Sequence, residues 1–478
     1  MKTACRLLLV TLVAWGCATN PATGRRQLML MSEAEEIQIG KQSDAEIRQQ
    51  MGLYDDAALQ EYVRSVGARL MTASHRPNLP WTFAVVDEPA VNAFAVPGGF
   101  IYLTRGILPY LQDEAQLAGV MGHEIGHVDA RHSAEAYSRQ LGAGLTLAIA
   151  GIFAPPETQA LQQAAGVGLG VLFLRYGRDA ELESDRLGVT YAAANGWDPR
   201  GVPGMLSTLA RLDEASGSSR GVPNWALTHP PAADRVERVQ EAVAAAPAGA
   251  TTTNASAFER HLDGMVFGDS REKGIVRGNQ FLHPILRFAV SFPDGWQVSN
   301  TDTQVSARPG ESSNAVMLLE LMQGGGGSVQ QVASAQMAQA GWRETSGERV
   351  SINGLEAYVA TYQGAIQNTP VAMRAAHVRA GNQTYVIAGL APTQQFANTA
   401  QVFASSIRSF RTLTAAEAER IQPDRVDFRT ARSGDTWESL AREVSAGRVS
   451  AATLAIMNGR TVSTPPKAGE RLRIVVGG

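Results

Sequence analysis

Cysteine is nearly absent from this chain of 478 residues. It occurs only twice, at Cys5 and Cys17, both close to the N-terminus. The rest of the sequence therefore cannot form a disulfide framework or a zinc site built from thiolates. Any metal site in the body of the protein must use histidine and carboxylate side chains instead.

The sequence also lacks an excess of positive charge and any long hydrophobic run. Its formal net charge is -3 at pH 7, so the composition gives no support for a nucleic-acid partner. Two apolar stretches, at residues 141–154 and 164–174, are divided by a pair of prolines. Neither reaches the ~20 residues that a transmembrane helix needs. We therefore expect helices near the functional site there, not membrane spans.

The first 17 residues have the order of a bacterial export signal. A positively charged start is followed by a short apolar run at residues 7–14, and then by Gly16 and Cys17. This segment resembles a lipobox, in which the cysteine is acylated and becomes the new N-terminus. The resemblance implies a lipid on Cys17 as a membrane anchor. Because Ala18 follows instead of aspartate, it also implies the periplasmic side of the outer membrane in a Gram-negative cell. A plain secretory signal with an incidental cysteine is the alternative.

The length and the low-complexity segments predict several domains. At ~150 residues per domain, the chain has room for about three. Residues 246–256, which are rich in alanine and threonine, are expected to be a linker. We predict a signal peptide over residues 1–17, a first domain over 18–245, a second α+β domain over 257–412 and a small module over 427–476.

The first domain is expected to be mainly helical. Apolar residues recur at helical spacing over residues 33–72, which predicts two helices. Residues 81–104 have strand chemistry, with a Pro-Gly-Gly turn at 97–99. Further helices are predicted over residues 112–138 and about 178–195, the second of which ends at an Asn-Gly pair.

The sequence His123-Glu124-Ile125-Gly126-His127 lies within the predicted helix at 112–138. Residues i and i+4 share one face of a helix, so the two imidazoles can bind one Zn²⁺ at ~2.0–2.1 Å. Glu124 is then placed to act as general base on a zinc-bound water whose pKa the metal lowers toward ~7. A surface helix with incidental histidines is the alternative, and the apolar residues before the motif argue against it. His132 is near but at the wrong spacing, so we expect it at the surface or against a zinc ligand.

The third ligand must come from another segment. The metzincin pattern is excluded, because alanine and serine stand where it requires glycine and histidine. A later acidic run offers Glu181, Glu183 and Asp185. Glu181 and Asp185 are four residues apart and share a helix face, whereas Glu183 points elsewhere. We therefore choose Glu181 as the third ligand, with Asp185 orienting a zinc-bound imidazole. Without the histidine motif, the run would be interpreted as a solvated acidic face.

Together these motifs resemble the HExxH gluzincin metallopeptidases that include HtpX, the CAAX prenyl proteases and periplasmic lipoprotein relatives. The resemblance covers about residues 25–245 and includes residues 92–99 and 228–231. It implies a thermolysin-like, mainly helical zinc peptidase domain in a chain of α+β class. It also implies one Zn²⁺ per chain, held by His123, His127 and Glu181.

The same resemblance implies further roles around the metal. The segment Asn92, Ala93, Phe94 and Ala95 would bind an extended substrate by β-augmentation. His229 would lie over the zinc and stabilise the oxyanion of the reaction. In some periplasmic relatives this histidine instead approaches the metal as an additional ligand and holds the enzyme latent. A satisfied loop histidine is the third alternative.

The two later segments also have resemblances. Residues 427–476 resemble a LysM module, on the basis of residues 430–441, 454–459 and 467–474. The LysM family implies a βααβ fold that binds the N-acetylglucosamine chains of peptidoglycan, although such a module can also serve as a spacer or protein contact. Residues 257–412 vaguely resemble the PsbP/Mog-like α/β sandwich and contain no catalytic constellation.

The sequence therefore predicts a zinc metalloendopeptidase that hydrolyses misfolded or unassembled cell-envelope proteins. Its partners would be protein or peptide substrates, peptidoglycan, and a membrane through the lipid, with no nucleic acid. The lack of long transmembrane helices favours protein over prenyl-peptide substrates. The alternatives are a latent protease that acts as a chaperone or envelope-assembly factor, and a peptidoglycan-binding scaffold.

Overall fold

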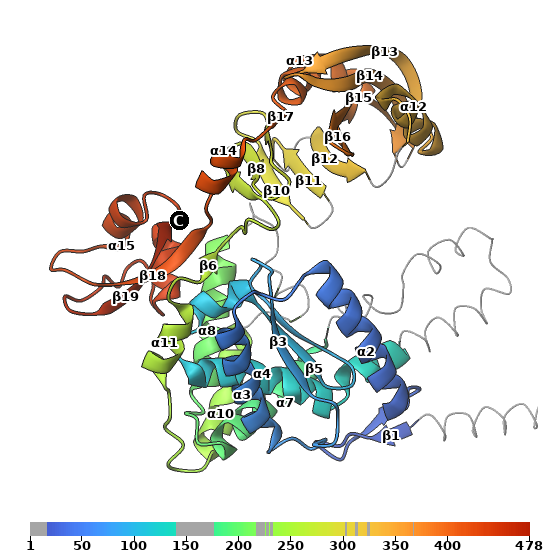
Figure 1. Ribbon diagram of the computed structural model, residues 1–478. Helices are drawn as coiled ribbons and strands as arrows, with labels where there is room; N and C mark the ends of the chain where they lie inside the picture. The colour runs from blue at the N-terminus through green and yellow to red at the C-terminus, as the bar shows by residue number, and fades with distance from the viewer. Residues whose placement is uncertain are drawn as a thin grey trace, which may run out of the picture. The chain divides into compact units, whose positions relative to one another are not determined.

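The computed structural model describes two compact parts of the chain (Figure 1). The first unit contains the residues up to Phe267 together with Arg425–Val476, and the second contains Gly268–Asp424 with Gly477–Gly478. The described residues are 17–139, 176–216, 225, 229, 233–301, 304–310, 314–322, 326–366 and 368–478. Most of the predicted signal peptide and both apolar stretches at 141–154 and 164–174 lie outside these ranges. Within them, no helix has both the length and the apolar character needed to cross a bilayer.

A small sheet of three strands forms one layer of the first unit. Its order is β3-β5-β4, with bounds Thr82–Val86, Phe100–Thr104 and Ala93–Val96. Strand β3 is parallel to β5, and β4 is antiparallel to it. The predicted strands at 81–104 are thereby confirmed. The turn between β4 and β5 uses Gly98 and Gly99, whose φ angles of 85° and 99° favour glycine.

The two helices predicted over residues 33–72 are confirmed as α2 and α3. Helix α2 spans Glu33–Gln50 and begins with a capping box at Ser32, which satisfies its first backbone N–H groups. Helix α3 spans Ala57–Met71, is capped by Asp56, and packs its apolar face against β3. Short elements complete this part: β1 (Cys17–Thr19), β2 (Arg26–Leu28), η1 (Arg105–Tyr110) and α11 (Ala255–Leu262).

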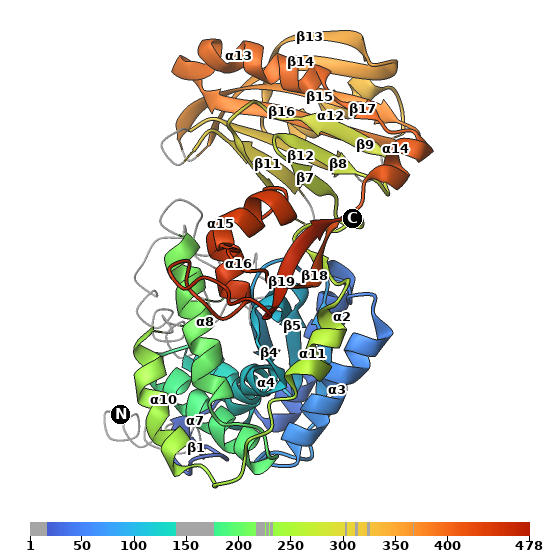
Figure 2. The same ribbon diagram turned by 90° about the vertical axis from the view of Figure 1, so that its left-hand side faces the viewer.

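Helix α4, Glu114–Asp129, is the central element, and every one of its residues is buried. It contacts β4, α7 and α8, while α10 packs on α7 and α8 (Figure 2). Helix α7 spans Arg178–Ala194, α8 spans Gly201–Ser216, and α10 spans Ala233–Ala245. As predicted, α7 ends at Asn195 and Gly196, where the glycine has φ 82°.

Glycine allows α4 and α7 to approach with backbone against backbone. A Cβ atom at Gly122 would lie 3.1 Å from the Cα of Gly188, and one at Gly126 would lie 3.0 Å from the Cα of Ser184. Any larger residue there would push the helices apart. The close packing brings the acidic run of α7 directly beside the histidine motif of α4.

The prediction of one continuous helix over residues 112–138 is wrong, because the helix is interrupted at residues 130–131. Helix α4 ends at Asp129 with Ala130 as its C-cap, and Arg131 has a φ of 58°. Residues 132–139 are helical again after this turn. A non-glycine residue in the left-handed region is uncommon, because its Cβ crowds the backbone. Ion pairs with a distant segment hold the turn, as described below, and residue spacing alone does not reveal them.

The C-terminal segment belongs to the first unit and shares its core. It contains β18 (Asp424–Thr430), α15 (Trp437–Ser439), η5 (Leu440–Val444), α16 (Ala451–Met457) and β19 (Arg471–Gly477), and β18 also pairs with β6 (Val266–Phe267). Trp437 and Leu454 lie in the same apolar cluster as residues of α4. Arg473, which is 3% exposed, donates to the carbonyls of Pro109, Leu111 and Gln112 just before α4. The segment therefore supports the start of the central helix.

The second unit is built on antiparallel sheets. Seven strands pair in the order β10-β11-β12-β16-β15-β14-β13, and four in the order β17-β9-β8-β7. Helices α12 and α13 pack on the longer sheet, whose two faces carry separate apolar clusters. The strands are β7 (Ile275–Arg277), β8 (Gln280–His283), β9 (Phe288–Ser291), β10 (Gln297–Asn300), β11 (Gln304–Arg308), β12 (Val316–Met322), β13 (Arg343–Ile352), β14 (Leu355–Ile366), β15 (Thr369–Ala380), β16 (Gln383–Pro392) and β17 (Arg411–Thr412). The helices are α12 (Val329–Gln339), α13 (Thr393–Arg408) and α14 (Ala415–Arg420).

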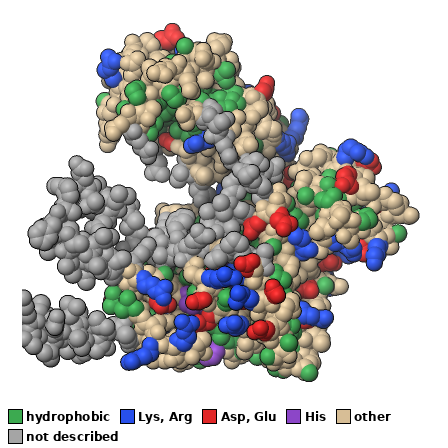
Figure 3. All heavy atoms as spheres, turned by 180° about the vertical axis from the view of Figure 1, so that it is seen from behind, with side chains coloured by type: hydrophobic (Ala, Val, Ile, Leu, Met, Phe, Trp, Pro, Cys, Tyr) green, Lys and Arg blue, Asp and Glu red, His purple; other side chains and the backbone are tan. Residues whose placement is uncertain are grey.

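These elements agree with the predicted α+β class, in which a helical domain precedes a β-sheet region. The domain limits drawn from the sequence and the LysM-like and sandwich-like assignments stay predictions. On the surface seen from behind, Lys and Arg side chains are interspersed with Asp and Glu (Figure 3). Exposed pairs such as Arg178 and Asp234, 3.3 Å apart, are common on such surfaces and contribute little to stability.

Candidate metal centre

Helix α4 places the two histidines of the HExxH motif on one buried face. His123 and His127 are both fully buried, and their Nε2 atoms lie 3.0 Å apart. Buried polar atoms must find partners inside the protein, because no water replaces them. The two rings therefore define the centre around which the other polar side chains gather.

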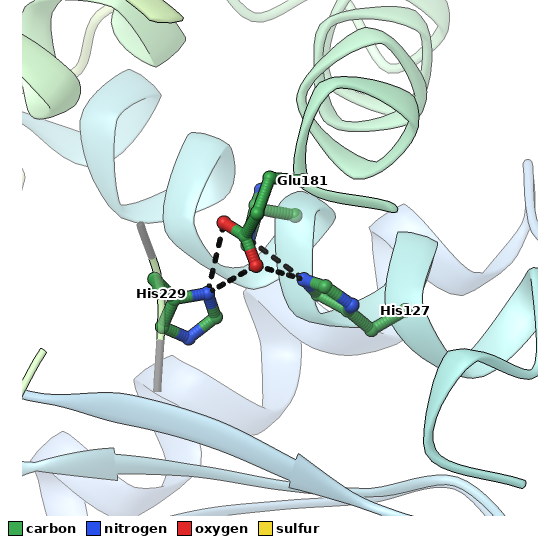
Figure 4. Close-up of side chains that lie close together, drawn as sticks. His127, Glu181 and His229 are labelled. Carbon is green, nitrogen blue, oxygen red and sulfur yellow. Dashed lines mark hydrogen bonds and ion pairs between the residues drawn. The ribbon is translucent and has the colours of Figure 1, made fainter. Parts of the chain in front are cut away.

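Glu181 of α7 and His229 complete a group of four donors. The Glu181 carboxylate lies 3.6 Å from His123 Nε2 and 3.4 Å from His127 Nε2. His229 Nδ1 lies 2.9 and 3.0 Å from the two oxygens of the same carboxylate. One ligand atom from each residue falls within 4.8 Å of the others. Figure 4 shows the side chains of His127, Glu181 and His229 pointing toward one another.

This donor set fits zinc. Zinc prefers four nitrogen and oxygen ligands at ~2.0–2.2 Å, which places neighbouring ligand atoms about 3.3–3.5 Å apart. The two distances from Glu181 to the histidines are 3.4 and 3.6 Å, close to this range. Glu124 gives a second indication, because both its carboxylate oxygens are buried and have no hydrogen-bond partner among the described residues. A carboxylate in that state is costly unless a cation or substrate group faces it. The predicted zinc site is thereby confirmed.

The protonation states suit metal binding. Burial alone would raise the pKa of Glu181, but His229, Arg235 and the hydrogen bond from His127 hold that pKa well below its usual range. Burial lowers the pKa of His127 well below its usual value, so this ring is in the neutral form that binds metals. Burial has the opposite effect on Glu124, whose pKa is raised.

Asp185 and Arg235 support the centre from behind. Asp185 Oδ1 lies 2.9 Å from His123 Nδ1, on the side of the ring away from Glu181. Arg235 of α10 donates to both oxygens of Asp185, at 2.6 and 2.8 Å. A third nitrogen of Arg235 lies 2.6 Å from Glu181 Oε2. The sequence did not point to Arg235, because it lies 50 residues beyond Asp185 and only the fold brings the two together.

His132 is buried, at 4% exposed, and its Nδ1 lies 3.0 Å from Nδ1 of His127. His132 was expected either at the surface or against a zinc ligand, and the structure shows it against the ligand His127. Burial lowers the pKa of His132 to about 4, so its ring is neutral near pH 7. Glu183, the rejected candidate ligand, accepts a hydrogen bond from Asn20 at 2.7 Å and lies 3.9 Å from His132 Nε2.

Aromatic rings enclose the histidines. Tyr176 stacks on His127 with ring centroids 3.9 Å apart, and its hydroxyl lies 2.8 Å from the Ser133 hydroxyl. Trp225 stacks on His229 at 4.0 Å. These contacts limit the rotation of the imidazoles. Aromatic residues carry no local sequence signal of such a role, so Tyr176 and Trp225 were not predicted.

The predicted substrate-binding segment lies at the edge of the small sheet. Ala93, Phe94 and Ala95 belong to β4, which packs against α4 and, among the described residues, pairs with β5 alone. Asn92 precedes the strand and accepts from Thr104 through its backbone carbonyl, at 3.0 Å. The edge position is suitable for β-augmentation, and the role stays a prediction.

The N-terminal anchor stays a prediction as well. The backbone of Cys17 begins β1, which pairs with β2, and Leu28 lies opposite it. The signal residues 1–16 are outside the described ranges, as are residues 226–228 and 230–232 around His229.

The part of the chain that holds the metal centre is similar to known proteins. Residues 57–243 match peptidase family M48, and all four candidate ligands lie in this range. The β-barrel assembly-enhancing protease of Escherichia coli is 32% identical over 219 residues, covering 44% of this chain and 44% of that protein. The mitochondrial metalloendopeptidase OMA1 of Arabidopsis thaliana is 32% identical over 190 residues, covering 39% and 37%.

The similarity to these proteins is partial. The OMA1 metalloendopeptidase of Danio rerio is 29% identical over 238 residues, covering 47% of this chain and 50% of that protein. This chain thus spans half or less of the length of these relatives. Among solved structures, the Ran-binding protein Mog1p of Saccharomyces cerevisiae matches with a TM-score of 0.24 and 13% identity, covering 30% of this chain and 98% of that chain.

Proposed function

We propose that this protein is a zinc metalloendopeptidase, because residues 57–243 match peptidase family M48 and contain the four-donor cluster. The observation that carries the proposal is the position of Glu124. Its two oxygens are buried beside the four-donor cluster and have no hydrogen-bond partner among the described residues, whereas an ordinary structural carboxylate would have one. A water or substrate group that donates a proton during the reaction would be the partner that Glu124 lacks among the described residues.

The residues of the chain divide the work of peptide hydrolysis. His123, His127 and Glu181 would hold the zinc, which would supply a Lewis acid that lowers the pKa of a bound water toward ~7 and polarises the substrate carbonyl. Glu124 accepts a proton from the attacking water on a carboxylate oxygen and then delivers it to the leaving nitrogen.

His229 faces the same space as the general base. Its Nε2 lies 3.8 Å from Glu124 Oε1, while Nδ1 contacts Glu181. In the active arrangement His229 donates a hydrogen bond to the oxyanion that develops on the substrate carbonyl. Removal of one such donor costs ~10²–10³ in kcat in other hydrolases.

The second candidate function is a latent protease that acts as a chaperone or envelope-assembly factor. The observation that favours it is the hydrogen-bond distance of 2.9 Å between His229 and Glu181, which places His229 inside the ligand group. Four protein ligands close a zinc site, whereas catalytic zinc keeps one position open. His229 would then have to leave before substrate binds.

We further propose protein substrates of the cell envelope, misfolded or unassembled. The support is the name of the similar E. coli protein, a β-barrel assembly-enhancing protease, together with the export-signal pattern before Cys17. A lipid on Cys17 would hold the protein on the periplasmic side of the outer membrane. Globomycin treatment of producing cells, followed by mass spectrometry of the N-terminus, tests the lipid; an unmodified Cys17 in untreated cells contradicts it.

Residues 427–476 are proposed to bind peptidoglycan as a LysM-like module. The order strand, two helices and strand supports the proposal, and the exposed loop that contains Val462 follows the second helix. Because this segment shares the core of the first unit, the test uses the whole protein. Val462→Glu should reduce co-sedimentation with purified peptidoglycan without changing zinc content. Equal sedimentation of both, or none of either, contradicts glycan binding through this loop.

Removal and return of the metal tests the catalytic proposal. The purified protein is freed of zinc with a chelator, and cleavage of an unfolded protein such as casein is followed before and after zinc is restored. We expect cleavage at internal bonds only in the restored protein. If the zinc-loaded wild type is inactive and His229→Ala is active, the latent state is the correct account. Zinc-loaded protein that is inactive in both forms contradicts endopeptidase activity.

A further inference from the structure

The turn after α4 is held by charged groups from far along the chain. Arg131, the residue with a φ of 58°, forms an ion pair with Glu36 and donates from Nη2 to the Met31 carbonyl at 2.8 Å. Glu36 is 1% exposed and also binds Arg76 at 2.9 Å. Buried ion pairs of this kind hold the backbone in a conformation that is otherwise unfavourable.

The strained turn has one clear consequence at the metal centre. A helix that continued past residue 130 would carry His132 away from His127, since residues five apart do not share a face. The left-handed residue instead folds the chain back, so that the two rings meet nearly edge to face, with an interplanar angle of 72°. His132 thus reaches the side of His127 that faces away from Glu181.

The contact between the rings requires one defined tautomer of each. Two Nδ1 atoms 3.0 Å apart cannot both present a lone pair to each other. One of them therefore carries a proton and donates a hydrogen bond to the other. When Nε2 of His127 is a metal ligand, its proton is on Nδ1, and Nδ1 of His132 is the acceptor. The proton of His132 is then on Nε2, the atom 3.9 Å from the Glu183 carboxylate.

We propose that His132 is a positioning residue of the zinc centre, which accepts the Nδ1 proton of His127 and so holds the Nε2 lone pair toward the metal. Asp185 supports the other histidine of α4 in the same way, because its Oδ1 lies 2.9 Å from Nδ1 of His123. The two ligands on α4 are therefore supported differently, one by a carboxylate and one by a neutral imidazole. The proposal rests on the zinc centre described above, but not on cleavage of any substrate.

Zinc affinity of the full chain tests this role. We compare His132→Asn with His132→Leu, because the two side chains have the same branched shape and only asparagine offers an acceptor near the position of Nδ1. Competition with a chelator should show a loss of ~10–100-fold in zinc affinity for His132→Leu, the usual effect of removing a partner of a metal ligand. His132→Asn should recover most of that loss.

His75→Leu is the matched control. His75 lies near the same end of α4, bonded to the Tyr191 hydroxyl at 2.8 Å and 3.7 Å from Asp129, and its partners among the described residues include no metal ligand. Its zinc affinity should equal that of the wild type. Circular dichroism of the metal-free proteins separates a loss of fold from a loss of affinity.

The zinc affinities of the two variants decide the proposal. Weak binding by the leucine variant with recovery by asparagine supports it. Wild-type affinity in the leucine variant overturns it, as does equal weakness in both variants, which would indicate packing instead of hydrogen bonding. If the leucine variant does not fold, the asparagine variant decides alone: near wild-type affinity supports the proposal, and a tenfold loss overturns it.

Discussion

The two units of this protein bury polar groups in different ways. The first unit buries a connected cluster of ionisable side chains in the middle of its core, formed by His123, Glu124, His127, Glu181, Asp185, His229 and Arg235. The described part of the second unit buries single histidines instead. His377 bonds to Gln336 at 2.6 Å, and burial lowers the pKa of both His283 and His377 to about 4, so both are neutral.

The difference shows where chemistry takes place. Buried charges are expensive, and replacement by apolar residues is often neutral or stabilising. A cluster that includes a carboxylate with no hydrogen-bond partner among the described residues, such as Glu124, is therefore explained by a function at that position. The second unit shows the ordinary case, in which apolar strand faces and α12 and α13 form the core.

Glu181→Gln should have the largest effect. The change removes the negative charge that pairs with Arg235 and His229 and leaves only a neutral amide oxygen, a weaker ligand, for the metal. We expect zinc affinity to fall by more than ~100-fold, beyond the effect of losing a supporting residue, and cleavage to stop. Glu183→Gln, two residues along the same helix, is the control and should keep its zinc. Loss of zinc in the control alone would reverse the choice between the two glutamates.

Phe288→Ala tests whether the second unit is structurally separate from the metal centre. Phe288 is 2% exposed and packs against Tyr385 and Phe410, with ring centroids 4.8 and 5.5 Å apart. The free energy of unfolding should fall by ~3–5 kcal/mol in the transition of this unit, because the change leaves a cavity. Urea unfolding, followed with zinc release, checks this. If Phe288→Ala lowers the urea concentration at which zinc is released as well as that at which the second unit unfolds, the two units unfold together.

Asp185→Asn should have an intermediate effect. Asparagine keeps the shape but loses the charge that binds Arg235 and orients His123. Zinc affinity should fall ~10–100-fold, as for other carboxylate partners of metal-binding histidines. Chelator competition measures this loss, and an unchanged affinity would mean that Arg235 and Glu181 hold the centre without Asp185.

Thr414→Ala should have the smallest effect. Thr414 caps α14 in the second unit and accepts from the Glu417 backbone at 3.2 Å. The loss of this cap should cost ~1 kcal/mol of unfolding free energy and leave zinc binding unchanged. Thermal unfolding with and without a chelator separates the two quantities. A change in zinc affinity would contradict the separation between the units.

Much of the metal centre could be predicted from the sequence because it depends on local periodicity. His123 and His127 are four residues apart, as are Glu181 and Asp185, and a helix places such pairs on one face. His229 entered only through the resemblance to a family. Arg235 lies in a third helix, and no spacing rule connects it with Asp185.

The end of α4 shows why the rest could not be predicted. No glycine or proline stands between His127 and Ser138, and so a helix to residue 138 was expected. The ion pair of Arg131 with Glu36, 95 residues away, fixes the turn that the structure shows. The placement of His132 depends on this distant contact. Likewise, the shared core of residues 425–476 and the first unit depends on Arg473 and on apolar contacts that composition does not indicate.

The central claim, that this buried cluster is a zinc peptidase site with Glu124 as its base, is tested most directly by Glu124→Gln. Zinc content and casein cleavage are measured on the wild type, on Glu124→Gln and on the control Glu183→Gln. We predict one zinc per chain in all three, with cleavage by Glu124→Gln reduced by ~10²–10⁴-fold and cleavage by the control unchanged. Wild-type cleavage by Glu124→Gln, or a wild type that binds no zinc, would contradict the account.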